Sequence, residues 1–256
     1  MAGNVSTAPL GNHINPEATF YVLVRDQKNR DPITYNTFPR AEPKKLSFVL
    51  NRRKYCKRSK SIREALEGVD SSLSDPNEPR RIEIENHDPD DFGVYVRWIE
   101  TESLNIPTDD DDPLFPLLRM YVLADELGDY SFANILINDI MQVSRELEHT
   151  PSKKEIWFVW ETIEEYDHPL KRLFVDYQIH EAAKESLIFE EYEQITFDYL
   201  NDVALQYWDL TKQERERRQS GREDVVFGVK CSERGMCYYH QHGIDRNHPS
   251  CAELGF

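Results

Sequence analysis

The sequence predicts an α+β fold, in which a short mixed sheet with surrounding helices is followed by a helical extension. Two observations predict it. In the first third of the chain, three short segments have the composition or alternation of strands and are separated by helix-like segments. From residue 114 onward, apolar residues recur at spacings of three and four, which is typical of helices alone. The expected strands are 20–24, 46–50 and 81–85.

Each expected strand has its own signal. Phe20 to Val24 is an unbroken run of β-branched and aromatic residues, which suits a buried strand. Leu46 to Leu50 has a similar composition. Arg81 to Glu85 alternates strictly between polar and apolar residues and therefore reads as a half-buried strand.

Helices are expected between and after the strands. The stretch after Asn51 has helical spacing at Ile62, Ala65, Leu66 and Val69. A later helix should begin at Asp88, because its side chain can cap the first free amides and proline suits the next position. That helix is expected to bury three apolar residues, Phe92, Val96 and Ile99.

The second half of the chain reads as five helical segments. Glycine at position 128 separates the first two. In the third, Trp157 and Trp160 could be an exposed binding anchor, but their helical spacing with Ile163 favours packing in the core. The expected segments are 114–127, 132–145, 154–165, 168–185 and 190–210.

Composition divides the rest of the chain. Residues 1–17 lack periodicity and are interpreted as a flexible arm. Residues 147–210 form the helical extension. Residues 211–224 contain no apolar side chain, so they form a charged linker or a solvated extension of the preceding helix. Residues 225–256 hold three of the four cysteines and three of the eight histidines, which makes them a distinct Cys/His-rich tail.

Charge and composition exclude several classes of protein. The formal net charge of −16 repels phosphate, so nucleic acid is an unlikely global partner. The first twenty residues have neither the cationic nor the apolar part of a secretory signal, and no stretch is apolar enough to cross a bilayer. We therefore expect a cytoplasmic or nuclear protein whose cysteines are reduced and that needs no membrane.

Three groups of residues carry a family resemblance: the second expected strand with the helix after it, the third strand with the helix that follows Asp88, and a closing helical pair. Their residues are Phe48–Asn51, Cys56–Ser59, Ile62–Leu66, Arg81–Glu85, Asp88, Pro89, Phe92, Tyr95–Ile99, Leu118, Tyr121–Leu127 and Phe132–Asn134. Together these segments are similar to BTB/POZ domains, above all those abundant in filamentous fungi. The match spans about residues 18–146.

The resemblance implies a protein that binds other proteins. Many BTB proteins recruit substrates to cullin-based ubiquitin ligases, and others scaffold transcriptional regulators, so the implied partners are a cullin scaffold or another BTB chain. The sequence also departs from the family. Asn51 stands where a histidine is usual, and the N-terminal arm lacks the apolar helix through which many BTB domains exchange elements in a homodimer.

The Cys/His-rich tail contains the sharpest chemical signal. Zinc binds four cysteine or histidine ligands in a tetrahedron, and residues of these types cluster within about twenty positions here. The alternatives are thiols and imidazoles without a ligand, or a disulfide between Cys237 and Cys251. The expected structural zinc ligands are Cys237, His240, His242 and Cys251, with Cys231 as a substitute.

Two charged segments have less specific interpretations. Residues 40–63 contain ten Lys or Arg and one acid, Glu42, which suits a solvated surface, a nuclear-import sequence or the docking site of an acidic partner. The four aspartates Asp109 to Asp112 lack the spaced ligands and the glycine of a calcium loop, so a solvated loop is expected.

No enzyme is expected, because the phosphate-binding loop, the nucleophile elbow and the His-Glu-x-x-His pattern are all missing from the sequence. The leading hypothesis is a non-enzymatic protein-interaction module that acts as an adaptor or scaffold. The alternative is a nucleic-acid-associated transcriptional regulator that uses the basic stretch and the tail. A third hypothesis, metal storage or sensing, requires the tail to exchange zinc reversibly.

Overall fold

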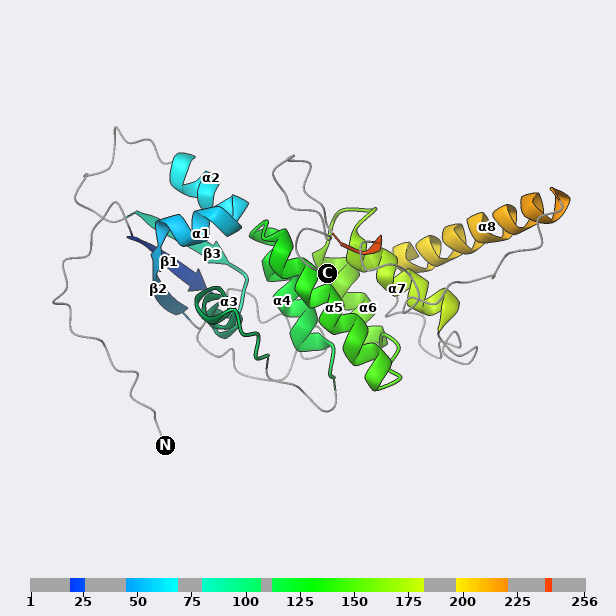
Figure 1. Cartoon of the computed structure of the whole chain (residues 1–256), viewed down its shortest axis with the longest axis horizontal. Helices are drawn as coiled ribbons and strands as arrows, with labels where there is room; N and C mark the ends of the chain where they lie inside the picture. Colours follow the sequence, from blue (N-terminus) through cyan, green and yellow to red (C-terminus); the bar gives the residue numbers. More distant parts are fainter. Residues whose placement is uncertain are drawn as a thin grey trace. The chain divides into compact units, whose positions relative to one another are not determined.

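A computed structural model describes residues 19–25, 45–68, 80–106, 112–181, 197–220 and 238–240. The α+β class is confirmed: these residues form eight helices and one three-stranded mixed sheet (Figure 1). The chain divides into two compact units, Met1–Gly93 and Val94–Phe256. The expected arm, residues 1–17, lies outside the described residues.

The sheet of the first unit contains all three predicted strands, β1 Thr19–Arg25, β2 Lys45–Asn51 and β3 Arg81–Glu85, in the order β2-β1-β3. β1 pairs antiparallel with β2, so that Val22 lies opposite Phe48, and parallel with β3, so that Val22 also lies opposite Ile82. β1 is the most buried strand because it has a neighbour on each side.

The helix-like stretch after β2 is divided into α1 Arg52–Arg58 and α2 Lys60–Gly68. Asn51 caps α1, since its side chain accepts a hydrogen bond of 3.1 Å from the Lys54 amide. Ser59 lies between the two helices in extended conformation, and its hydroxyl accepts from the Ile62 amide at 3.1 Å. Tyr55 of α1 packs edge-on against Phe20 of β1 and so fixes the helix to the sheet.

The helix α3 Pro89–Thr101 begins where the sequence predicts, because the Asp88 carboxylate accepts from the Asp90 amide at 2.8 Å. Phe92 and Ile99 are buried as expected. The expectation that Val96 is buried is wrong, because this residue is only half-buried and Tyr95 is buried in its place. The Tyr95 hydroxyl can be buried because it donates to Asp129 Oδ2 at 3.1 Å.

The hairpin of α4 Phe115–Glu126 and α5 Tyr130–Glu146 forms the centre of the second unit. The turn between them contains Gly128, whose φ of 64° is the left-handed conformation that favours glycine. Asp129 then caps α5 by accepting from the Phe132 amide at 3.1 Å. The predicted break at residue 128 is confirmed.

Three more helices follow, α6 Lys153–Thr162, α7 Pro169–His180 and α8 Phe197–Gln219. Residues 182–185 and 190–196, which were expected to be helical, lie outside the described residues. The charged segment at 211–224 continues α8 as helix through Gln219, as the interpretation of a solvated extension requires. In the described ranges, no helix combines the length and the apolar character that a bilayer-spanning segment requires.

The tryptophans of α6 have different environments. Trp160 is buried and packs edge-on against Tyr199 of α8, with 4.9 Å between the ring centroids. Trp157 is half-buried. Core packing is therefore confirmed for Trp160, and it is this ring that connects α6 to α8.

Candidate functional site

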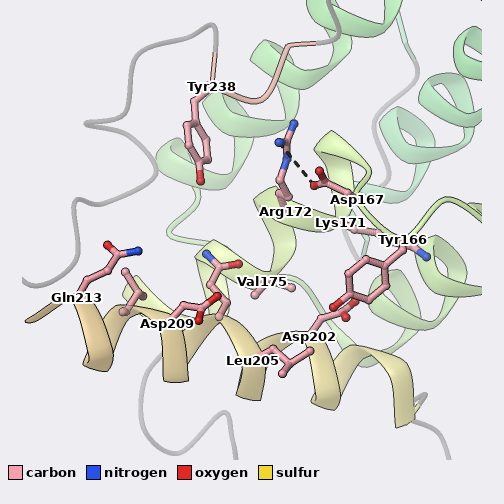
Figure 2. A pocket seen from close by; sticks show the side chains of 12 residues that line it. Tyr166, Asp167, Lys171, Arg172, Val175, Asp202, Leu205, Asp209, Gln213 and Tyr238 are labelled. Atoms are coloured by element: carbon pink, nitrogen blue, oxygen red, sulfur yellow. Dashed lines mark ion pairs between the residues drawn. The ribbon is translucent and has the colours of Figure 1, made fainter.

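A groove between α7 and α8 has a volume of about 520 Å³. Figure 2 shows Tyr166 beside Asp202, Tyr238 on the side of the groove away from α8, and Leu205 and Asp209 along the α8 wall. Tyr166 follows α6, and Tyr238 belongs to the Cys/His-rich tail. Three segments that are distant in sequence therefore form this site.

Two cations line the α7 side of the groove and have different surroundings. The Arg172 guanidinium pairs with Asp167 at 3.6 Å and lies 5.9 Å from the centroid of the Tyr238 ring (Figure 2). The Lys171 ammonium lies 5.5 Å from the centroid of the Trp160 ring. Burial lowers the pKa of Lys171, and the Asp202 and Asp198 carboxylates oppose this shift.

Asp202 contributes a hydrogen-bond acceptor to the groove. Its Oδ2 accepts from the Trp160 indole at 3.2 Å. Its Oδ1 is buried and has no close hydrogen-bond partner among the described residues, but the neighbouring Tyr166 hydroxyl also hydrogen-bonds the Asp202 carboxylate. A ligand donor that reaches Oδ1 would complete the hydrogen bonding of this carboxylate.

Three consecutive residues of the tail, 238–240, pack against one another and against helices of the second unit. The Tyr239 hydroxyl donates to Asp176 of α7 at 2.6 Å, and both residues are fully buried. His240 is also buried, with its Nε2 2.9 Å from Asn138 Oδ1 of α5. Tyr238 packs edge-on against Tyr239, so the same anchor places Tyr238 in the lining of the groove.

Of the predicted zinc ligands, only His240 belongs to the described residues. Cys237, His242, Cys251 and the substitute Cys231 lie outside them. Within the described ranges, no three His, Cys, Asp or Glu side chains are grouped so that they could hold a metal ion. The zinc site stays a prediction, and the structure adds that the His240 imidazole is held against α5 through its Nε2.

The basic stretch falls largely on α1 and α2. Five of the seven residues of α1 are Lys or Arg, and they surround the half-buried Cys56. Burial raises the pKa of the Cys56 thiol, and Arg52 opposes this shift. Lys60 forms an exposed pair with Glu64 at 3.9 Å, a geometry that contributes little to stability. Arg40 and Lys44 lie outside the described residues.

The acidic run is described only at its last member. Asp112 Oδ2 lies 2.8 Å from the Lys154 ammonium, which in turn lies 4.3 Å from the centroid of the Phe115 ring. This carboxylate therefore takes part in an ion pair that joins the loop to α6. Asp109 to Asp111 lie outside the described residues.

Sequence reasoning missed the exposed aromatic residues of the second unit. The neighbouring Leu205 is also exposed, at 48%, and lines the groove. A helical projection of 197–210 separates a face that contains Tyr199 and Val203 from one that contains Phe197 and Trp208. This separation is the sequence signal that could have predicted the exposed aromatic residues of this helix. The exposed aromatic residues are Tyr166, Phe197, Tyr207, Trp208 and Tyr238.

Comparison with protein-family models and with curated proteins finds no match to this chain.

Proposed function

We propose that this chain is a non-enzymatic protein-interaction module with a BTB/POZ-like core and a helical extension that binds a second protein. The observation that carries the proposal is the groove of the helical unit, which is lined by two exposed tyrosines, Tyr166 and Tyr238, and by the exposed Leu205. Contiguous exposed apolar surface with a polar rim marks interaction sites. Tyrosine and tryptophan also dominate the energetics of protein interfaces.

The order of the elements supports the family assignment. The segments that carry the resemblance fold as β2 with α1 and α2, then β3 with α3, and then the hairpin of α4 and α5. These are the strand and helix, the next strand and helix, and the closing helical pair that the resemblance implies. The boundaries at 18 and 146 stay predictions, as do the limits of the later segments.

The groove suits a peptide segment of a client protein. Its two tyrosines offer apolar rings with polar tips, and Leu205 adds apolar surface on the α8 wall. The Oδ1 atom of Asp202 can accept a backbone or side-chain N–H of the client. The client would thus bind by contact with the two tyrosines and Leu205 and by a hydrogen bond beside Tyr166 (Figure 2).

In this proposal the BTB-like core binds a cullin scaffold, and the groove presents the client to it. Titration of the full chain into a purified cullin N-terminal domain in a calorimeter tests the first half. We expect a dissociation constant in the micromolar range or tighter, and heats no larger than those of dilution would overturn the adaptor role. The groove variant Leu205→Asp is the matched control, because it should leave cullin affinity unchanged.

A second function, nucleic-acid binding, is favoured by one observation, the concentration of basic residues on α1. Fluorescence anisotropy of a labelled DNA duplex and of a labelled RNA at low salt distinguishes it from the first. The adaptor proposal predicts no binding of either. Binding that weakens steeply with added salt would favour the regulator instead.

A further inference from the structure

The helix α8 has a buried face and an exposed face. On the buried face, Tyr199 packs against Trp160, and its hydroxyl donates to Gln178 of α7 at 2.9 Å. Gln206 on the same face donates to Asp176. These contacts hold the helix against α6 and α7, while its C-terminal half extends away from the other helices of the unit (Figure 1).

The exposed face contains a regular stripe. Its members alternate at spacings of four and three residues, the repeat with which one helix contacts another along its whole length. Phe197 is 82% exposed and Trp208 is 64% exposed. We define the outer stripe as six residues that extend over about 27 Å of helix. They are Phe197, Asn201, Ala204, Trp208, Thr211 and Arg215.

The outer stripe is complementary to itself when one copy is reversed. About a two-fold axis near position 206, Trp208 faces Ala204, so the largest side chain meets the smallest. Phe197 faces Arg215, a geometry for a cation–π contact. Asn201 faces Thr211, and these side chains can share a hydrogen bond. Each of these contacts occurs twice, as in any isologous interface.

A parallel arrangement has no such complementarity. It would place Arg215 against Arg215 and leave the two tryptophans competing for the same space. Charge along one edge of the stripe also favours the reversed direction, because reversal brings the exposed Asp198 of one copy toward the exposed Lys212 of the other.

We propose that the outer stripe of α8 binds the same stripe of a second copy of this chain, as an antiparallel two-fold helix pair. The pairing does not rest on the adaptor role, because the stripe and the groove occupy different faces of α8. Two large apolar side chains per copy must offset the entropy lost on association, so we expect a dimer of micromolar affinity.

Sedimentation equilibrium of the full chain tests the pairing. Between about 1 and about 300 µM, the average mass should rise from that of one chain, 30.2 kDa, toward twice that value. Trp208→Glu should remain a monomer over the whole range. The matched control is Leu147→Glu, since Leu147 is 59% exposed and lies on another helix end, and it should dimerise like the unmodified chain.

A pair of charge variants tests the direction. In the antiparallel pair, the side chain at position 197 faces Arg215 of the other copy. The glutamate of Phe197→Glu would form an ion pair with this arginine, whereas the lysine of Phe197→Lys would be repelled by it. We expect the lysine variant to dimerise about tenfold more weakly than the glutamate variant. In a parallel pair each substitution would face itself, so equal weakening by the two would overturn the antiparallel arrangement.

Two further outcomes would overturn the proposal. One is a monomer at the highest concentration, and the other is a dimer that Trp208→Glu leaves intact. Failure of this pairing is distinguishable from failure of the adaptor role, because Trp208→Glu should bind the cullin domain with unchanged affinity per chain.

Discussion

Tyr239 and Asp176, 63 residues apart in sequence, are joined by a hydrogen bond of 2.6 Å in which the tyrosine hydroxyl donates to the carboxylate. Asp176 is fully buried, accepts a second hydrogen bond from Gln206 and lies 3.7 Å from His180 Nε2. One carboxylate therefore connects α7, α8 and the Cys/His-rich tail. The groove depends on all three, so this connection holds the candidate site together.

Replacing Tyr239 with phenylalanine should destabilise the second unit. The substitution removes a donor from a buried carboxylate, which typically costs about 1–3 kcal/mol. Urea unfolding followed by tryptophan fluorescence measures the loss. Tyr207→Phe is the control, because Tyr207 is exposed and its change should stay within about 0.5 kcal/mol. Equal stability of the two variants would contradict the role of the anchor.

Replacing Asp129 with alanine should cost more than the loss of a helix cap alone. Asp129 caps α5 through Oδ1 and accepts from the buried Tyr95 hydroxyl through Oδ2. Loss of the cap should lower the free energy of unfolding by about 1 kcal/mol. The buried Tyr95 hydroxyl, left without its acceptor, should lower it by about 1–2 kcal/mol more. Asp129→Asn keeps an oxygen for the cap, so denaturant unfolding should place it between the alanine variant and the unmodified chain. An asparagine variant as unstable as the alanine variant would contradict this division.

Replacing Gly128 with alanine should lower the free energy of unfolding by about 1 kcal/mol, because a Cβ strains the left-handed backbone at φ 64°. Gly68→Ala is the matched control. Gly68 ends α2, and a Cβ there meets nothing within 4 Å, so this variant should be neutral or slightly stabilising. Thermal unfolding of both variants measures the contrast, and a loss of stability in both would contradict the argument.

Asp139 should make stability depend on pH. Burial raises the pKa of its carboxyl above the ordinary value of 3.8, so the folded chain binds the proton more tightly than the unfolded chain. Its contribution to stability therefore falls as the pH rises from 3.8 through the raised pKa. Asp139→Asn should be more stable than the unmodified chain at pH 7, and the difference should shrink toward pH 4.

The control for this pH dependence is Asp209→Asn, because Asp209 is exposed and its substitution should give no comparable gain. Thermal unfolding between pH 4 and pH 7 measures both variants. A gain for Asp139→Asn that is the same at all pH values would contradict desolvation as the cause.

The Cys/His-rich tail is predicted to bind one zinc ion per chain. Metal analysis of the full chain after dialysis checks this number, and Cys237→Ser should lower it because a ligand is lost. The control Tyr207→Phe, which lies outside the tail, should leave it unchanged. A metal content near zero in the unmodified chain would contradict the prediction and favour thiols without a ligand.

Local signals in the sequence were sufficient for most element positions. The start of α3 followed from Asp88 and Pro89, whose capping and backbone preferences act within a few residues. The choice between Tyr95 and Val96 could not be made in this way, because it depends on Asp129, 34 residues away. The division at Ser59 was also missed, since either helix alone is too short for a clear periodicity.

The groove was less predictable than the fold. Its residues come from three segments, and the contact that brings the tail to α7 joins positions 176 and 239. No local pattern encodes a contact of that range. The exposed face of α8 could have been predicted from the sequence, because Phe197 and Trp208 are eleven residues apart and so lie on one side of a helix.

The most direct test of the central claim is the mass of the full chain, measured by light scattering during size-exclusion chromatography, alone and mixed with a purified cullin N-terminal domain. A protein-interaction adaptor should elute with the cullin domain as one complex. Separate elution of the two proteins, with this chain as a monomer at every concentration, would contradict the proposed function.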